Sequence, residues 1–207
     1  MDEQPSQTNA PGDGVPAMFP LMLDIGELPI FFVTGGDAVH RIEMLDEHGA
    51  KHLSVFAKAP SEKMRAACGG RLTVRWPDEE DFKTLRPRIV FVAGMEENLA
   101  KAFRTMAKTV GALVHVEDRI PLCDFHLPAR VRRGHLQVTV STDGTVAGLS
   151  RLIREHLEAH VFGPEWSERV DELAAARRKW KDEGYSFDAL SRAIREFVTE
   201  RQWLVKK

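Results

Sequence analysis

Apolar residues in the first half of this chain come in short continuous runs that alternate with segments of helical spacing. The run Ile30 to Val33 follows a proline and predicts a buried strand, and the run Leu53 to Phe56 predicts another. Between them lie the small-residue turn Thr34 to Ala38 and the segment Val39 to Leu45, whose apolar positions fall on one helical face. Gly49 then ends the predicted helix. A strand, a turn, a helix and a second strand form one βαβ unit with parallel strands.

The same alternation continues to about residue 120. A continuous apolar run predicts a buried strand, and apolar positions three and four residues apart predict an amphipathic helix. In chain order we expect a helix from Ser61 to Cys68, a short strand from Leu72 to Val74 and a solvated loop from Pro77 to Asp81. A strand from Ile89 to Ala93, a helix from Glu96 to Thr109 and a strand from Ala112 to Val116 follow. In the helix from Glu96, we expect Leu99, Phe103 and Met106 to face inward. These elements predict an α/β fold with a doubly wound, Rossmann-like parallel sheet over residues 18–120.

The hydrophobic pattern changes after Asp118. Residues Leu136 to Ser141 alternate between apolar and polar side chains, which predicts a half-exposed strand. Helical spacing then predicts three helices, which are Leu149 to Leu157, Trp166 to Lys181, and Phe187 to Leu204 with Ser186 as its N-cap. We therefore expect a small dimerisation and substrate segment at 121–150 and a helical domain at 151–207. An isolated exposed strand beside apolar helices predicts pairing with a second copy, that is, a homodimer.

Composition and charge narrow the class of protein. The chain has 207 residues and a net charge of −2, so nothing favours binding to nucleic acid or to an anionic membrane. Its two cysteines, Cys68 and Cys123, are too few for a disulfide framework and fit no zinc spacing. No apolar run reaches the length of a membrane span, and residues 1–17 lack the apolar core of a signal peptide. We expect a disordered lead at 1–17, rich in proline and glycine, and a cytoplasmic protein.

The turn after the first strand is the candidate cofactor site. Free N–H groups and a helix dipole at such a turn face a pyrophosphate, so Thr34, Gly35, Gly36, Asp37 and Ala38 are candidate dinucleotide-binding residues. The glycine spacing matches the dinucleotide fingerprint incompletely, and no acid that would bind a ribose lies near the end of the second strand. An ordinary strand-to-helix turn is an equally good interpretation of the spacing.

Blocks of sequence spread over most of the chain support a more specific interpretation. They are Leu23-Asp24, Pro29-Ile30, Gly35-Gly36-Asp37-Ala38, Arg41-Ile42-Glu43, Gly49-Ala50, Val114 to Asp118, Leu122 to Phe125, Pro128-Ala129, Arg133-Gly134, Leu136, Ser141-Thr142, Gly144 and Leu149 to Arg154. Together these blocks, within roughly Met18 to Val161, resemble the precorrin-2 dehydrogenase family, which includes the N-terminal region of siroheme synthases. The block at Leu149 resembles the helix that opens the family's dimerisation region.

The resemblance implies a Rossmann-like domain, a dimerisation region and a helical domain. It implies an enzyme that oxidises the tetrapyrrole precorrin-2 to sirohydrochlorin with NAD⁺ as cofactor, on the route to siroheme or cobalamin. Some members of the family also insert ferrous iron into the product, which makes the metal a substrate.

This sequence departs from the family mainly on the cofactor side. Thr34 takes the place of the first of three glycines, and the turn is one residue short before Ala38. A Cβ atom at a turn that must touch pyrophosphate is expected to weaken NAD⁺ binding. Lys58 follows the second strand where an acid is usual, and it is either a contact for a 2′-phosphate or an ordinary solvated lysine.

The resemblance also assigns candidate chemistry. Asp118 matches the aspartate that the family uses in catalysis, and it follows a strand's carboxyl end, where open α/β sheets bind ligands. From the residues alone, a loop aspartate that caps local backbone is the simpler interpretation. His115 precedes it by three residues and is either a substrate-site residue that shares a metal or a proton with Asp118, or a satisfied strand histidine. Asp124 and His126 are candidates to join His115 and Asp118 in a loose His/Asp cluster suited to Fe²⁺ or Co²⁺, but no fixed helical spacing relates these residues.

A second group of candidates lies further along the chain. Ser141, Thr142 and Gly144 match the family's tight turn near the tetrapyrrole, although Thr142-Asp143-Gly144 is also an ordinary turn. The cationic residues Arg130, Arg132 and Arg133 are candidates to steer a polycarboxylate substrate, or form a solvated face.

Three functions follow. The first is an NAD-dependent precorrin-2 dehydrogenase. The second is a ferrochelatase or cobaltochelatase with a degenerate NAD site, and the third is a non-catalytic tetrapyrrole-binding homologue.

Overall fold

The computed structural model describes residues 18–204, so the disordered lead predicted at 1–17 lies outside the described residues. The chain divides into two units, Met1–Leu127 and Pro128–Lys207. The division therefore comes after the boundary predicted at residue 120. The physical reason is that Phe125 and Leu127 pack against the core of the first unit.

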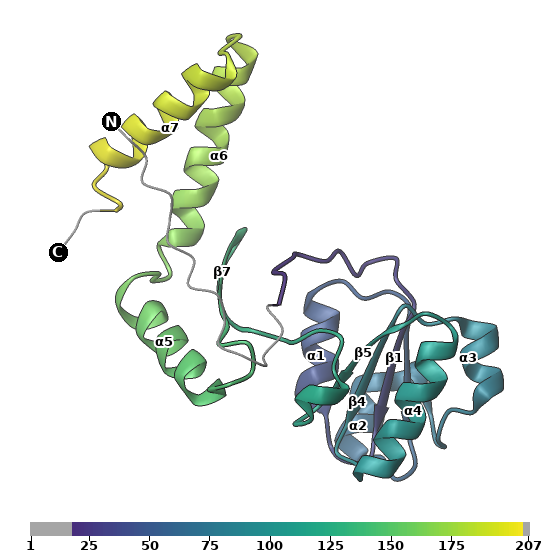
Figure 1. Ribbon diagram of the computed structural model, residues 1–207. Helices are drawn as coiled ribbons and strands as arrows, with labels where there is room; N and C mark the ends of the chain where they lie inside the picture. The colour runs from purple at the N-terminus through teal and green to yellow at the C-terminus, as the bar shows by residue number, and fades with distance from the viewer. Residues whose placement is uncertain (1–17, 205–207) are drawn as a thin grey trace. The chain divides into compact units, whose positions relative to one another are not determined.

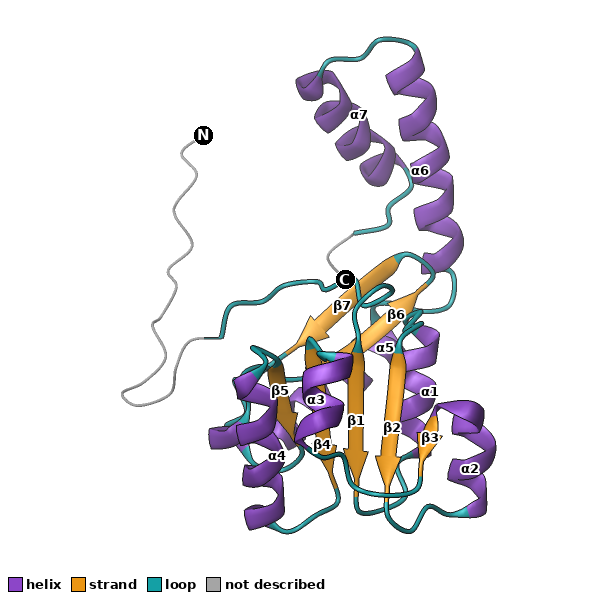
Figure 2. Cartoon of the chain, turned by 90° about the vertical axis from the view of Figure 1, so that its right-hand side faces the viewer, coloured by secondary structure: helices purple, strands orange, loops and turns teal. Residues whose placement is uncertain are grey.

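The first unit is built on a five-stranded parallel sheet, as predicted. Its strands lie in the order β3-β2-β1-β4-β5 and point the same way in Figure 2. They are β1 Ile30–Thr34, β2 Leu53–Ala57, β3 Leu72–Thr73, β4 Ile89–Ala93 and β5 Leu113–Val116. The order of the strands reverses between β1 and β4, which is the switch point where open α/β sheets bind ligands.

Helices cover both faces of this sheet (Figure 1). They are α1 Val39–Glu47, α2 Glu62–Cys68, α3 Glu79–Leu85 and α4 Glu97–Thr109. Alternate side chains of β1 pack on the two faces of the sheet, because successive side chains of a strand point to opposite faces. Ile30 and Phe32 pack with α1 and α2, whereas Phe31 and Val33 pack with α3 and α4. The doubly wound arrangement predicted from the apolar runs is thereby confirmed.

Helix α3 replaces the solvated loop predicted at Pro77 to Asp81, so that prediction was wrong. Asp78 accepts hydrogen bonds from the N–H groups of Glu80 and Asp81, and the Asp81 side chain accepts one from the N–H of Asp78 in return. This reciprocal capping box begins the helix. Phe82 is then buried against the sheet. The acidic run therefore begins a helix. Asp78 takes the capping-box position where serine or threonine is usual, and Asp81 takes the position where glutamate is usual.

The second unit combines a hairpin with three helices. Its elements are β6 Ala129–Arg133, β7 Leu136–Val140, α5 Ala147–His160, α6 Trp166–Asp182 and α7 Phe187–Glu200. Strand β7 pairs antiparallel with β6, so the prediction of an isolated strand was wrong. The arginines of β6 had hidden its strand pattern. The N-cap predicted at Ser186 is confirmed, since its hydroxyl accepts the N–H of Ala189.

Few apolar side chains of the second unit are buried. Among its described residues, the buried apolar ones are Val131, Trp166 and Leu190. Helix α5 exposes Leu149, Leu152 and Ile153 to solvent. No helix between residues 18 and 204 has both the length and the apolar character needed to span a bilayer.

Candidate functional site

Three loops meet at the edge of the sheet where the parallel strands end. They follow β1 at Gly35 to Ala38, β4 at Gly94 to Glu96, and β5 at Glu117 and Asp118. Because β1, β4 and β5 are neighbours in the sheet, their loops share one edge beyond the switch point. This edge is the candidate functional site.

Thr34 folds inward and holds the first of these loops. Its side chain is only 1% exposed. The hydroxyl donates to the carbonyl oxygen of Gly36 at 3.0 Å and accepts the N–H of Gly36 at 3.1 Å. The Cβ atom therefore does not project from the exposed side of the turn. The steric reason for expecting weak NAD⁺ binding is absent, although the hydroxyl does occupy one N–H group.

Gly35 allows the loops after β1 and β4 to touch. A Cβ atom added there would lie 2.3 Å from the carbonyl oxygen of Gly94. The N–H of Gly35 donates to the carbonyl of Ala93 at 3.0 Å, and Gly94 has a φ of +59°. At Gly36 an added Cβ atom would meet nothing within 4 Å. The turn is thus packed closely against the loop after β4 at Gly35, whereas the space beside Gly36 is open.

At the beginning of helix α1 two backbone N–H groups have no acceptor within the described protein, one on the exposed Asp37 and one on Ala38, which is 3% exposed. The N–H of Val39 donates to Asp37 Oδ1 at 3.2 Å. Within residues 18–204, the N–H groups of Asp37 and Ala38 donate to no protein acceptor. Two such groups at a helix N-terminus suit a pyrophosphate. The turn therefore fits a dinucleotide, with Asp37 and Ala38 as the residues that would hold its phosphates.

Asp118 lies on the same edge, exposed, two residues beyond the end of β5. Its backbone has a φ of +58°. Aspartate tolerates this left-handed conformation better than most residues do, but glycine would adopt it more easily. A carboxylate kept at such a position is a candidate for chemistry.

His115 points into a packed layer. Its ring lies 6.0 Å from that of Phe91 and 5.6 Å from that of Phe125, measured between centroids. Its Nδ1 lies 3.1 Å from the carbonyl oxygen of Phe125, to which an N–H there donates. Burial lowers the pKa of His115, and the nearby Arg41 acts in the same direction. The ring is consequently neutral at pH 7 and supports the loop that follows β5.

Asp124 is held by cations of helix α4. Its carboxylate accepts the N–H of Val114 at 2.9 Å and lies 2.8 Å from Lys108 Nζ. Arg104 lies 3.6 Å away. The predicted cluster of His115, Asp118, Asp124 and His126 does not form, and the Asp124 carboxylate pairs instead with cations of α4. No group of three potential metal ligands occurs among the described residues.

One contact at this edge was not predicted. Arg41 of α1 and Glu117 form an ion pair at 3.2 Å, which ties the first helix to the residue before Asp118. No local pattern signals this pair, because its members are 76 positions apart in the chain.

The second group of candidates lies in the second unit, between β7 and α5. Ser141 Oγ accepts the N–H of Asp143 at 3.1 Å, and Thr142 Oγ1 accepts the N–H of Val146 at 3.2 Å. Thr142 also shares a hydrogen bond with Ser150 at 3.1 Å, and Gly144 has a φ of +82°. These hydroxyls hold their own turn.

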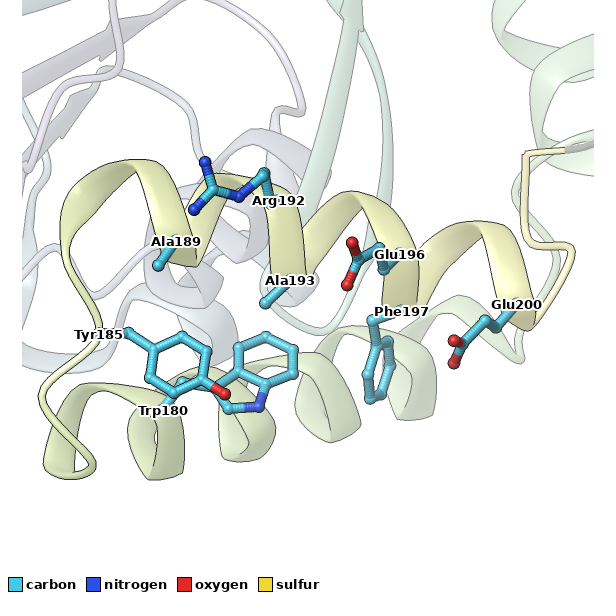
Figure 3. Close-up of a pocket in the computed structure, with 8 residues that line it drawn as sticks. All are labelled: Trp180, Tyr185, Ala189, Arg192, Ala193, Glu196, Phe197 and Glu200. Atoms are coloured by element: carbon cyan, nitrogen blue, oxygen red, sulfur yellow. The ribbon is translucent and has the colours of Figure 1, made fainter.

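A shallow cavity of about 320 Å³ lies between α6 and α7. Figure 3 shows Trp180 and Tyr185 on one side of it and Arg192 on the other. None of the residues predicted to bind cofactor or substrate lines it.

Known proteins share parts of this sequence and its fold. Residues 21–129 match a family described as putative NAD(P)-binding. A siroheme synthase of Yersinia pestis is 31% identical over 166 residues, which cover 78% of this chain and 34% of that protein. The siroheme synthase of Gluconobacter oxydans is 30% identical over 190 residues, covering 86% of this chain and 38% of that protein. The chain thus spans about a third of the length of these relatives.

A solved structure shares the fold. It is that of "SirC, precorrin-2 dehydrogenase", which matches with a TM-score of 0.65 and 22% identity over 90% of this chain and 91% of that one.

Proposed function

This chain belongs to the putative NAD(P)-binding family, and on that premise we propose that it is an NAD-dependent precorrin-2 dehydrogenase of siroheme biosynthesis. The likeness to siroheme synthases supports this function. The observation that carries the proposal is the shared edge of the sheet. There the turn after β1, exposed at Gly36 and Asp37, and the exposed carboxylate of Asp118 after β5 lie at the ends of two parallel strands that flank β4.

The first unit provides the cofactor site. NAD⁺, when bound, accepts a hydride from the substrate. The N–H groups of Asp37 and Ala38 bind the pyrophosphate together with the positive end of α1. Gly36 leaves room for the phosphates, because no described atom lies within 4 Å of a Cβ atom placed there.

Asp118 provides the proton acceptor. Oxidation of precorrin-2 to sirohydrochlorin removes two electrons and two hydrogens, one as the hydride and one as a proton. A carboxylate at the carboxyl end of β5 takes that proton and passes it to solvent. Its exposure provides the route to water. The bound substrate is a polycarboxylate tetrapyrrole, which requires an open site of this kind.

The test is an assay of the full chain with precorrin-2 and NAD⁺ under anaerobic conditions. We expect NADH and sirohydrochlorin to appear in equal amounts, with multiple turnovers. Oxidation at the same rate when NAD⁺ is omitted, or no oxidation above the rate without protein, contradicts the proposal.

A second function, insertion of Fe²⁺ or Co²⁺ into sirohydrochlorin, is favoured by one observation. Thr34 already satisfies the N–H of Gly36, and the Asp37 carboxylate already accepts the N–H of Val39. Fewer donors then remain for a dinucleotide than in a turn of glycines alone. The metal is a substrate here, and Asp118 would accept pyrrole protons. Metal insertion without NAD⁺, in the absence of precorrin-2 oxidation, would favour this alternative.

We also propose that the chain forms a homodimer through helix α5. Its exposed Leu149, Leu152 and Ile153 form an apolar stripe, and a second copy of the same helix would cover it. Light scattering after size-exclusion chromatography tests this. A dimer in the wild type and a monomer in Leu152→Glu are expected, whereas a monomeric wild type at micromolar concentration contradicts it.

A further inference from the structure

Strand β2 does not supply the acid that dinucleotide-binding folds of this kind use. In such folds an aspartate or glutamate after the second strand accepts hydrogen bonds from the adenosine ribose. Here β2 ends at Ala57. The residues from Lys58 to Ser61 include no acid. A dinucleotide in this site therefore meets no carboxylate from β2.

A carboxylate reaches the same place from another element. Asp37, in the turn after β1, accepts the hydroxyl of Ser61 on Oδ2 at 3.1 Å and the N–H of Val39 on Oδ1 at 3.2 Å. Ser61 is also the N-cap of α2, since its Oγ accepts the N–H of Met64. The Asp37 side chain thus extends from the start of α1 to the loop after β2. It remains exposed to solvent.

The position of Asp37 matches the path of the cofactor. Its own N–H is one of the two that are free to bind the pyrophosphate. The adenosine half of a dinucleotide leaves the pyrophosphate toward β2, and the other half extends toward β4 and β5. A side chain that leans from the phosphate site toward the loop after β2 therefore lies beside the adenosine ribose.

We propose that Asp37 takes the place of the missing acid of β2 and makes the site selective for NAD⁺ over NADP⁺. Its carboxylate accepts hydrogen bonds from the ribose hydroxyls of NAD⁺, and Ser61 orients it. The same negative charge repels the 2′-phosphate of NADP⁺. Lys58, exposed just after β2, acts in the opposite direction, and the carboxylate outweighs it because Ser61 and Val39 hold it in place. This inference rests on the cofactor assigned under the proposed function.

The test is titration of the full chain with NAD⁺ and with NADP⁺, followed by calorimetry. We expect the wild type to bind NAD⁺ at least tenfold more tightly than NADP⁺. Asp37→Asn keeps an oxygen for the N–H of Val39 but removes the charge. In this variant the Kd of NADP⁺ should fall about tenfold, and the Kd of NAD⁺ should rise. Glu43→Gln makes the same change of charge at an exposed position of α1 away from the turn, and should leave the ratio of the two Kd values unchanged.

The outcomes separate this inference from the proposed function. Equal or tighter binding of NADP⁺ by the wild type overturns the role of Asp37 and leaves the dehydrogenase intact. The role of Asp37 is also overturned if Asp37→Asn changes the Kd of NAD⁺ and the Kd of NADP⁺ by the same factor, because Asp37 would then act only on the shape of the turn. Failure of the wild type to bind either dinucleotide overturns both the inference and the proposed cofactor.

Discussion

The two units of this chain differ in how completely each covers its own apolar side chains. In the first unit, every residue of β1 and β4 is buried, and helices of the same chain cover both faces of the sheet. In the second unit, α5 leaves Leu152 63% exposed. The first unit can therefore present a preformed site on a rigid frame, whereas the second has an apolar surface that a partner would cover.

The difference extends to the polar groups. In the first unit the turn at Asp37 and Ala38 keeps N–H groups that no described residue satisfies. In the second unit the hydroxyls of Ser141 and Thr142 are used within their own turn. Resemblance in sequence marked both turns as candidates. The hydroxyls that made the second turn a candidate are already used within the protein, so we expect the chemistry to depend more strongly on the first turn.

Truncation of a core side chain should give the largest change in stability. Phe103 of α4 is buried, and Phe103→Ala should lower the free energy of unfolding by about 3–5 kcal/mol. Leu152→Ala removes an exposed side chain and should change the unfolding of the monomer by less than about 0.5 kcal/mol. Denaturation with urea in dilute solution measures both. Similar losses in the two variants would show that α5 is packed within its own chain.

Gly35→Ala should disturb the cofactor site at its base. The added Cβ atom would lie against the carbonyl oxygen of Gly94, so the loops after β1 and β4 must separate. We expect a loss of about 1–3 kcal/mol in stability and weaker binding of NAD⁺. Gly36→Ala is the matched variant, with open space around the new atom, and its unfolding should match that of the wild type. If Gly35→Ala unfolds and binds NAD⁺ like the wild type, the two loops are not held together.

Acid should destabilise the first unit through His115. Burial lowers the pKa of this side chain in the folded state, so the unfolded chain binds the proton more readily. The stabilisation is complete above the ordinary histidine pKa of about 6.5 and is lost as the pH falls below it, by at most about 1.4 kcal/mol per pH unit. His115→Gln should flatten that part of the profile. An unchanged pH dependence of unfolding in this variant would contradict the contribution.

The ion pair of Arg41 and Glu117 should have the smallest effect. Both side chains are about one-third exposed, and such pairs contribute roughly 0–1 kcal/mol. Arg41→Ala should reduce stability within that range, and 1 M salt should remove most of the difference. A loss of several kcal/mol, measured by thermal unfolding, would mean that the pair is buried when the protein is in solution.

The sheet was predictable because its strands are buried on both faces and stand out as continuous apolar runs. Helix α3 was missed because its start at Asp78 looked like a polar loop, and β6 was missed because arginines interrupt its apolar positions. The boundary after Leu127 depends on the packing of Phe125 against distant residues, which no local pattern reveals.

The site was predictable only in part. The turn and Asp118 were located by the ends of strands and by resemblance to a family. The inward orientation of Thr34 follows from the alternation along β1, but only once the faces of the sheet are known. The contacts of Asp124 with α4 and of Asp37 with Ser61 join residues far apart in the chain. No local sequence pattern predicts them, and only the three-dimensional structure reveals them.

The most direct test of the central claim is a single-turnover reaction of precorrin-2 with NAD⁺ on the wild type and on Asp118→Asn. Asparagine tolerates the positive φ of this position but does not accept a proton. We predict one NADH per active site in the wild type, and a rate at least about 100-fold lower in the variant with unchanged binding of NAD⁺. NADH formation at the wild-type rate in Asp118→Asn would contradict the assignment of this carboxylate as the proton acceptor.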